Sequence, residues 1–202
     1  MTDPLVRGIV LGEDPSVLAR LGLDARRAGD GTTATCVGGV ALHAVGTDGG
    51  RGLLAFDLGP DARAPVPTET MPTISAGAAG FDHALGALAV DHVVVLAGDA
   101  DATVAAFGVQ PRRREERGGQ VYAYIVAGSC LIEVVAPVVT DDRPPTLWGL
   151  ALSVRDLDAA AAYLGDACGA PKEAVQPGRR IATVRGDVLG LATPLALLSP
   201  RG

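Results

Sequence analysis

Short apolar runs alternate with alanine-rich amphipathic segments along this chain, and their order recurs. In the last two thirds, apolar runs at 90–95 and 148–152 each precede an amphipathic segment that opens on Asp, at 99–107 and 156–164. Asp suits a helix N-terminus, because its carboxylate accepts hydrogen bonds from backbone N–H groups that have no partner in the helix. Each segment is followed by a Gly and by further strand-like runs, listed as 120–125, 131–135, 180–184 and 194–198. The pattern predicts a unit of strand, helix and three strands, present twice.

The first sixty residues repeat this order more faintly. An apolar run at 6–11 precedes a short predicted helix at 14–21 with a capping Asp14, and the run 38–45 aligns with 128–135 without a gap. Leu54–Asp61 resembles the start of the last unit, which makes it a candidate opening strand of a fourth. The pattern predicts four regions: a degenerate N-terminal βαβββ-like module at 1–62, a connector at 63–86, a βαβββ module at 87–140 and a C-terminal module at 146–202.

Composition and charge narrow the class of protein. Apolar residues make up 48% of the 202 residues and aromatic residues only 3%, so the core must consist mainly of Val, Leu, Ala and Ile. A net charge of −6 argues against a nucleic-acid partner, which needs a basic face. The run 112–114 is all Arg but is followed directly by two Glu, so we interpret it as a solvated strand edge. No apolar stretch approaches the roughly 20 residues that span a bilayer, and three scattered cysteines do not suggest a disulfide framework. We therefore expect a cytoplasmic protein with no membrane partner.

Two ionisable residues interrupt the apolar runs of the middle module, namely His92 and Glu133. Together they could bind a divalent metal ion or move protons. The alignment of the modules places Gly149 and Ala196 at the equivalent positions of the C-terminal module, and neither can coordinate an ion. His92 can equally be a structural residue of a buried strand. A Glu among apolar neighbours favours a cavity-facing carboxylate, because buried Glu is rare unless it is paired.

The strand around His92, the segment 128–135 and the second copy from 148 to 200 resemble the vicinal oxygen chelate superfamily, in particular its glyoxalase-like and bleomycin-resistance-like members. The resemblance implies an α+β fold in which tandem βαβββ modules form a curved mixed sheet around a bowl. It also implies that the first and last strands of each module supply ligands to one divalent ion. Carried over to this chain, the metal ligands are His92 and Glu133, with Mn, Fe, Ni or Zn as the possible ion and Glu133 as the catalytic residue.

The strands between these positions supply the expected walls of the bowl. Tyr122 and Tyr124 share one face of a strand, because side chains alternate with a period of two. Arg113, Trp148 and Arg180 lie near strand ends in the alignment, as does the neighbour of Arg180 at position 179. We expect these residues to contact a small-molecule ligand, and an arginine in the bowl would suit an anionic one.

Three functions follow as hypotheses. The first is a protein that binds a small molecule in the bowl without a complete metal site. The second is a divalent-metal-dependent lyase, isomerase or dioxygenase in which His92 and Glu133 are completed by a residue such as His43 or by another subunit. The third is an assembly role, in which an unpaired N-terminal module joins its counterpart in a homodimer. The two missing ligand positions favour the first.

Overall fold

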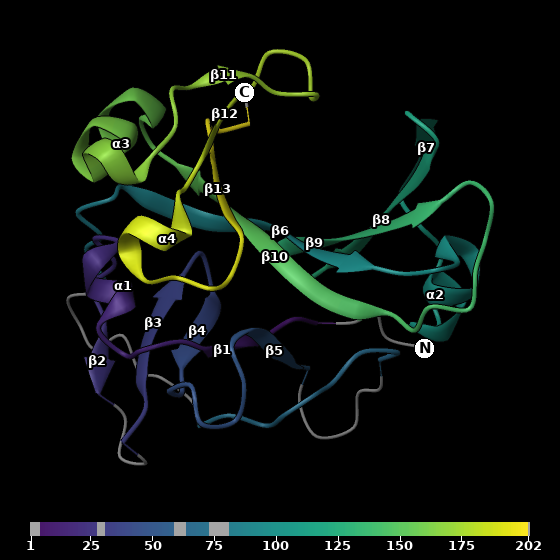
Figure 1. Ribbon diagram of the computed structural model, residues 1–202, viewed down its shortest axis with the longest axis horizontal. Helices are drawn as coiled ribbons and strands as arrows, with labels where there is room; N and C mark the ends of the chain where they lie inside the picture. Colours follow the sequence, from purple (N-terminus) through teal and green to yellow (C-terminus); the bar gives the residue numbers. More distant parts are fainter. Residues whose placement is uncertain (1–4, 28–30, 59–63, 73–80, 202) are drawn as a thin grey trace.

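The computed structural model describes residues 5–27, 31–58, 64–72 and 81–201, and it contains two β-sheets. Figure 1 shows the larger sheet curving so that its two ends rise on the same side of its central strands, while the smaller sheet lies against the opposite side. No helix in the described part of the chain is long and apolar enough to cross a membrane. The fold class that the resemblance implied, an α+β protein with curved mixed sheets, is confirmed.

The larger sheet holds the two clear modules side by side. Its strand order is β11-β12-β13-β10-β6-β9-β8-β7, and the central pair β6 and β10 is antiparallel. Within each module the first strand pairs in parallel with the last. The elements are β6 (Ala87–Leu96), α2 (Ala100–Ala106), β7 (Arg113–Arg117), β8 (Gln120–Ala127), β9 (Cys130–Pro137), β10 (Thr146–Val154), α3 (Leu157–Leu164), the 3-10 turn η1 (Gly165–Ala167), β11 (Lys172–Glu173), β12 (Arg180–Thr183), α4 (Gly186–Leu189) and β13 (Leu195–Leu198).

The predicted helix starts of both modules are confirmed. The Asp99 carboxylate accepts a hydrogen bond from the Ala102 backbone N–H at 2.9 Å, directly before α2. Asp156 does the same for Ala159 at 3.0 Å, directly before α3. Of the run 112–114, Arg113 and Arg114 belong to the edge strand β7, as expected, whereas Arg112 lies just before it.

The smaller sheet contains the N-terminal repeat. Its order is β2-β3-β4-β1-β5, in which β1 pairs in parallel with β4, so it repeats the strand order of the larger sheet's modules. The predicted Asp14 cap was wrong: the helix begins at Val17, and Asp14 accepts the Ser16 backbone N–H in the turn ahead of it. The elements are β1 (Gly8–Gly12), α1 (Val17–Arg20), β2 (Arg26–Arg27), β3 (Thr33–Val37), β4 (Val40–Ala44) and β5 (Gly52–Asp57).

Strand β5 behaves as the opening strand of a reduced fourth module. It lies antiparallel beside β1, as β10 lies antiparallel beside β6. On its other edge, Phe56 forms a parallel bridge with Thr68, where the larger sheet has the parallel pair β10 and β13. The connector therefore contributes a short closing segment, although the expected strand residues 59–61 lie outside the described part. The homodimer hypothesis assumed an unpaired N-terminal module, but β5 already takes the place beside β1.

The core lies between the two sheets. Leucines from β1, α1 and β4 meet leucines from β10 and β13 there, and they are listed as Leu11, Leu18, Leu42, Leu150, Leu152 and Leu195. Since side chains alternate along a strand, β10 turns Leu150 and Leu152 to this core and turns Ala151 and Ser153 to the concave side. The N-terminal sheet thus covers the convex face of the larger sheet and leaves the concave face for a site.

Candidate functional site

A line of charged and polar side chains crosses the centre of the larger sheet. His92 on β6 has its Nδ1 atom 3.0 Å from Asp91 Oδ1 and its Nε2 atom 3.4 Å from Glu133 Oε2 on the neighbouring strand β9. Both sides of the imidazole therefore face a carboxylate. The two residues named from the sequence, His92 and Glu133, come together in the folded chain, and Asp91 joins them.

A β-bulge explains why Asp91 and the adjacent His92 can meet in one cluster. In the pairing of β6 with β10, His92 lies opposite Ala151 and Val90 lies opposite Leu152, which leaves Asp91 as an extra residue. A bulge of this kind re-aims a side chain that regular alternation would send to the other face. The sequence signal was present, since two consecutive polar residues interrupt an otherwise apolar strand.

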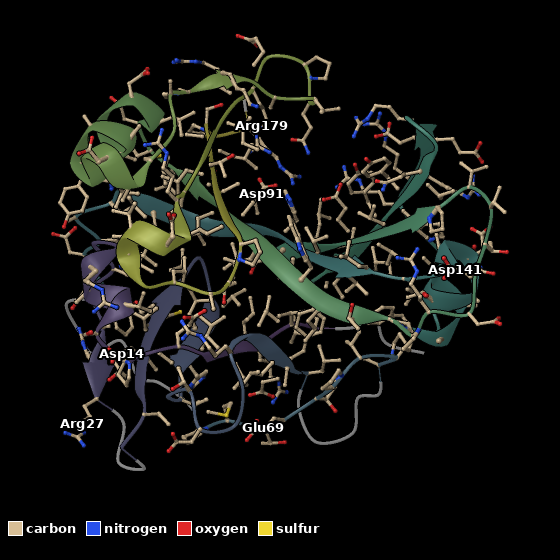
Figure 2. The ribbon with its side chains drawn as sticks, viewed as in Figure 1. Asp14, Arg27, Glu69, Asp91, Asp141 and Arg179 are labelled. Carbon is tan, nitrogen blue, oxygen red and sulfur yellow. The ribbon has the colours of Figure 1, made fainter. Side chains whose placement is uncertain are left out.

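Asp91 is buried and is held by an arginine of the C-terminal module. Arg179 Nη2 donates to Asp91 Oδ2 at 2.8 Å, and both side chains are about 95% buried, with exposed fractions of 5% and 3%. Burial alone would raise the pKa of Asp91, but the hydrogen bonds from His92 and Arg179 outweigh it and hold that pKa well below its ordinary value. Asp91 is therefore an anion at neutral pH. Figure 2 shows Asp91 and Arg179 directed toward one another on the concave side of the sheet.

Tyr124 extends the cluster onto strand β8. It lies opposite Glu133 in the sheet register, and its hydroxyl donates to Glu115 at 3.4 Å. Burial and the nearby Glu133 carboxylate raise the pKa of Tyr124 above its ordinary value. The phenol therefore stays protonated at neutral pH and is available as a hydrogen-bond donor.

Two neighbouring cavities open on this side of the larger sheet. The larger has a volume of about 550 Å³ and is lined by Arg112, Arg113, Tyr124, Leu131, Gln176, Pro177, Gly178, Arg179 and Arg201. The smaller, of about 310 Å³, is lined by Ala89, Val90, Asp91, Arg112, Val126, Gly128, Ser129, Cys130, Leu131, Ser153 and Arg201. The two share Arg112, Leu131 and Arg201, so they meet along these three residues.

Of the wall residues expected from the sequence, Tyr124 and Arg113 line the larger cavity. The other three are not among the residues lining the two cavities, and neither are His92 and Glu133, although Glu133 was expected to face a cavity. Tyr122 donates to Gln120 and lies beneath the Arg117 guanidinium, whereas Trp148 is a half-exposed residue at a bulge of β10. Arg180 ion-pairs with Asp158 of α3, so it points away from the bowl. The adjacent Arg179, which directly precedes β12, lines the larger cavity instead.

Three residues of the site were not predicted from the sequence. Asp91 was visible only as a neighbour of His92, and Arg112 was grouped with the solvated arginine run. Arg201 follows the last strand, and its Nη2 atom reaches Asp91 Oδ1 at 3.3 Å. Of the three, only Asp91 had a sequence signal, in the two consecutive polar residues at the bulge. Arg112 and Arg201 had none, because their convergence depends on how the modules pack.

The strand registers allow the two modules to be compared position by position. Glu133 lies opposite Val94, two residues after His92, and Ala196 lies opposite Ala151, two residues after Gly149. Gly149 and Ala196 therefore occupy the places of His92 and Glu133, as the sequence alignment has it. A Cβ atom added to Gly149 would lie only 2.5 Å from the Pro194 carbonyl oxygen, so the backbone itself fills the space where a ligand side chain would start.

These residues do not make a complete metal site. His92 and Glu133 are two possible ligands, and Asp91 holds the imidazole as outer carboxylates do around metal-bound histidines. Catalytic sites of this type generally use three protein ligands. No group of three or more His, Cys, Asp or Glu side chains suited to an ion occurs in the described residues, and His43 lies in the smaller sheet.

No protein-family model and no curated protein sequence matches this chain, but solved structures do. A mutant of 4-hydroxymandelate synthase from Streptomyces coelicolor is similar with a TM-score of 0.61 and 15% identity, over 100% of this chain and 94% of that one. A xylose isomerase-like TIM barrel/4-hydroxyphenylpyruvate dioxygenase fusion protein gives 0.63 and 11%, over 100% of this chain and 49% of that one. This chain has the vicinal oxygen chelate fold.

Methylmalonyl-CoA epimerase from Mycobacterium tuberculosis is also similar, with 22% identity and a TM-score of 0.48 over 58% of this chain and 91% of that one. At these identities the comparisons establish the fold and leave the reaction open. In this chain the bowl holds the adjacent His92 and Glu133 side chains, a buried Asp91–Arg179 pair and arginines on both walls.

Proposed function

We propose that this protein binds a small molecule in the bowl of its larger sheet without a protein-held metal ion. Its polar floor is the cluster of Glu133, His92 and Tyr124, of which only Tyr124 is among the residues lining the two cavities. The observation that carries the proposal is the filled position at Gly149, where the Pro194 backbone leaves no room for a third ligand side chain. The larger cavity supports it, because about 550 Å³ lies within the usual range of small-molecule sites.

The polar floor gives the bowl its chemistry. The Glu133 carboxylate can accept hydrogen bonds, and the Tyr124 hydroxyl can donate one. Because the Asp91 carboxylate holds Nδ1, the imidazole has a fixed orientation. A ligand with adjacent donor and acceptor atoms would therefore find matched partners without a metal ion.

The test is native mass spectrometry of protein purified without chelator, combined with metal analysis. We expect a retained small molecule in the wild-type protein and its loss from Leu131→Trp, because Leu131 lines both cavities. Val139→Trp, at an exposed residue outside both cavities, is the control and should retain the molecule. Metal content should stay well below one equivalent after incubation with Mn, Fe(II), Ni or Zn. Absence of any retained molecule, or equal retention by Leu131→Trp, would contradict the proposal.

A divalent-metal lyase, isomerase or dioxygenase is the second candidate, favoured by one observation. Asp91 orients His92 in the manner of an outer carboxylate at a metal site, and Glu133 Oε2 lies 3.4 Å from its free side. In this case Glu133 would be the catalytic residue, and a further ligand would come from another module or from another subunit. Stoichiometric metal that is lost in both His92→Ala and Glu133→Gln would favour this candidate over the first.

A further inference from the structure

The cavities in the bowl are basic although the protein is acidic. Four arginines and one aspartate line them, in a chain whose net charge is −6. Arg112 and Arg113 belong to the wall formed by the middle module, and Arg179 and Arg201 belong to the opposite wall. Like charges that face one another across a cavity raise its potential and attract an anion.

The four arginines differ in how far they are already neutralised. Arg179 is fully engaged, since it bonds Asp91, the Ser199 carbonyl oxygen and the Gln176 side chain. Arg113 pairs with Glu115 on its own strand. Arg201 makes one contact of 3.3 Å with an Asp91 that already has a closer partner, and half of its side chain is exposed.

Arg112 has no ion-pair partner in the part of the chain that the structure describes, unlike its neighbours Arg113 and Arg114. It also lies where the two cavities meet, together with Arg201. Two guanidinium groups with donors to spare therefore approach the junction from opposite walls. A planar guanidinium binds a carboxylate or phosphate through paired hydrogen bonds.

The smaller cavity beyond this junction has five apolar residues in its lining, namely Ala89, Val90, Val126, Cys130 and Leu131. Its other lining residues beyond the junction are Gly128, the hydroxyl residues Ser129 and Ser153, and the Asp91 carboxylate, which already pairs with Arg179 and disfavours a second anion. Burial raises the pKa of the Cys130 thiol to about 12, so this wall carries no thiolate at neutral pH. The cavity therefore suits a short apolar group rather than a second charged one.

Resting on the proposed function, we infer that the ligand is an amphipathic anion. Its carboxylate or phosphate lies between Arg112 and Arg201 at the junction of the cavities, and a short apolar arm enters the smaller cavity. This assigns ligand recognition to Arg112, a residue of the arginine run that sequence alone presents as a solvated edge.

The experiment compares three probes that share one apolar arm and differ in the head group. Hexanoate, hexyl phosphate and 1-hexanol are titrated into the whole protein by calorimetry at one low ionic strength. We expect both anions to bind, with hexanol at least about tenfold weaker, as the loss of charge-assisted hydrogen bonds predicts. Arg112→Gln should weaken both anions by at least about tenfold and leave hexanol unchanged.

Arg114→Gln is the matched control, because it removes the same charge two residues along the same arginine run. Arg114 pairs with Asp101 of α2 and is not among the residues lining either cavity, so its substitution should leave all three affinities unchanged. If hexyl phosphate and hexanoate bind with different affinities, the tighter-binding anion is the one that fits the junction better. Either order of affinities supports the inference.

The inference is overturned if hexanol binds as tightly as the anions, if neither anion binds, or if Arg112→Gln acts no differently from Arg114→Gln. Leu131→Trp separates this failure from that of the proposed function. Hexanol binding that Leu131→Trp abolishes would leave a binding bowl without anion selection. Probe binding that Leu131→Trp does not change would place the ligand elsewhere and remove both proposals.

Discussion

Asp91 is a buried anion whose partners come from both modules of the bowl. His92 is its neighbour on β6, and Arg179 belongs to the segment before β12. Breaking such a pair is costly, because the remaining charge stays in a medium that solvates it poorly. The pair therefore fixes the C-terminal wall against the strand that carries His92.

Substitution of Arg179 tests this role. We expect Arg179→Met to lower the free energy of unfolding by about 3 to 5 kcal/mol, since it leaves Asp91 buried without its cation. Arg180→Met is the control, because the Arg180–Asp158 pair is exposed and should contribute only about 0 to 1 kcal/mol. Urea unfolding at neutral pH measures both, and equal losses would show that the buried pair has no special role.

At the scale of elements, the strand pairing of the repeating unit is kept even where other elements of the unit are absent from the described residues. Each module opens with a strand that pairs in parallel with its last strand. The fourth unit keeps this relation in shortened form, as β5 and the bridge from Phe56 to Thr68. The pairing of first and last strands thus persists where the helix and the middle strands do not.

The helix caps offer a prediction at this scale. Asp99→Ala and Asp156→Ala should each lower the free energy of unfolding by about 1 kcal/mol, because each removes the side chain that caps the start of its helix. Asp142→Ala, in an exposed loop, should change stability by less than about 0.5 kcal/mol. Thermal unfolding followed by circular dichroism provides the comparison. Caps that prove no more sensitive than Asp142 would mean that packing alone positions both helices.

At the scale of the whole molecule, one carboxylate ties the N-terminal repeat to the C-terminal module. Glu13 is fully buried and accepts hydrogen bonds from the Ala192 and Thr193 backbone N–H groups and from the Thr193 hydroxyl, at 2.7 to 3.0 Å. These residues lie just before β13, which is part of the bowl wall. The convex-side sheet therefore supports the site through a specific polar contact as well as through the leucine core.

Glu13→Gln tests the support. Its amide nitrogen would face donors instead of accepting from them, so we expect a loss of about 1 to 3 kcal/mol. Hydrogen exchange at the amides of Ala192 and Thr193 should accelerate. Glu69→Gln, at an exposed side chain, should alter neither quantity. Destabilisation without faster exchange at these two amides would argue against a local contact between the modules.

Sequence and structure contributed different parts of the site. His92 and Glu133 stood out because ionisable residues interrupt apolar strands there. The registers of β6, β9, β10 and β13 agree with the alignment that paired them with Gly149 and Ala196. From the sequence, Arg180 rather than Arg179 was predicted to line the bowl, on its place near a strand end alone. The structure reverses this prediction, since Arg179 lines the larger cavity and Arg180 pairs with Asp158. No sequence signal marked Arg112, because the pattern of a charged run does not distinguish an arginine that faces water from one that faces a cavity.

The sequence by itself determined the βαβββ repeat, its Asp-capped helices and the contrast between His92 and Glu133 and their counterparts Gly149 and Ala196, because all three depend on local periodicity and on residue identity. Only the tertiary structure decided which charges meet. The bulge at Asp91, the Pro194 backbone that fills the position at Gly149, and the arginines of the two walls are products of strand register and of module packing. The energies of buried charges depend on distances across the fold, and no local pattern in the chain encodes those distances.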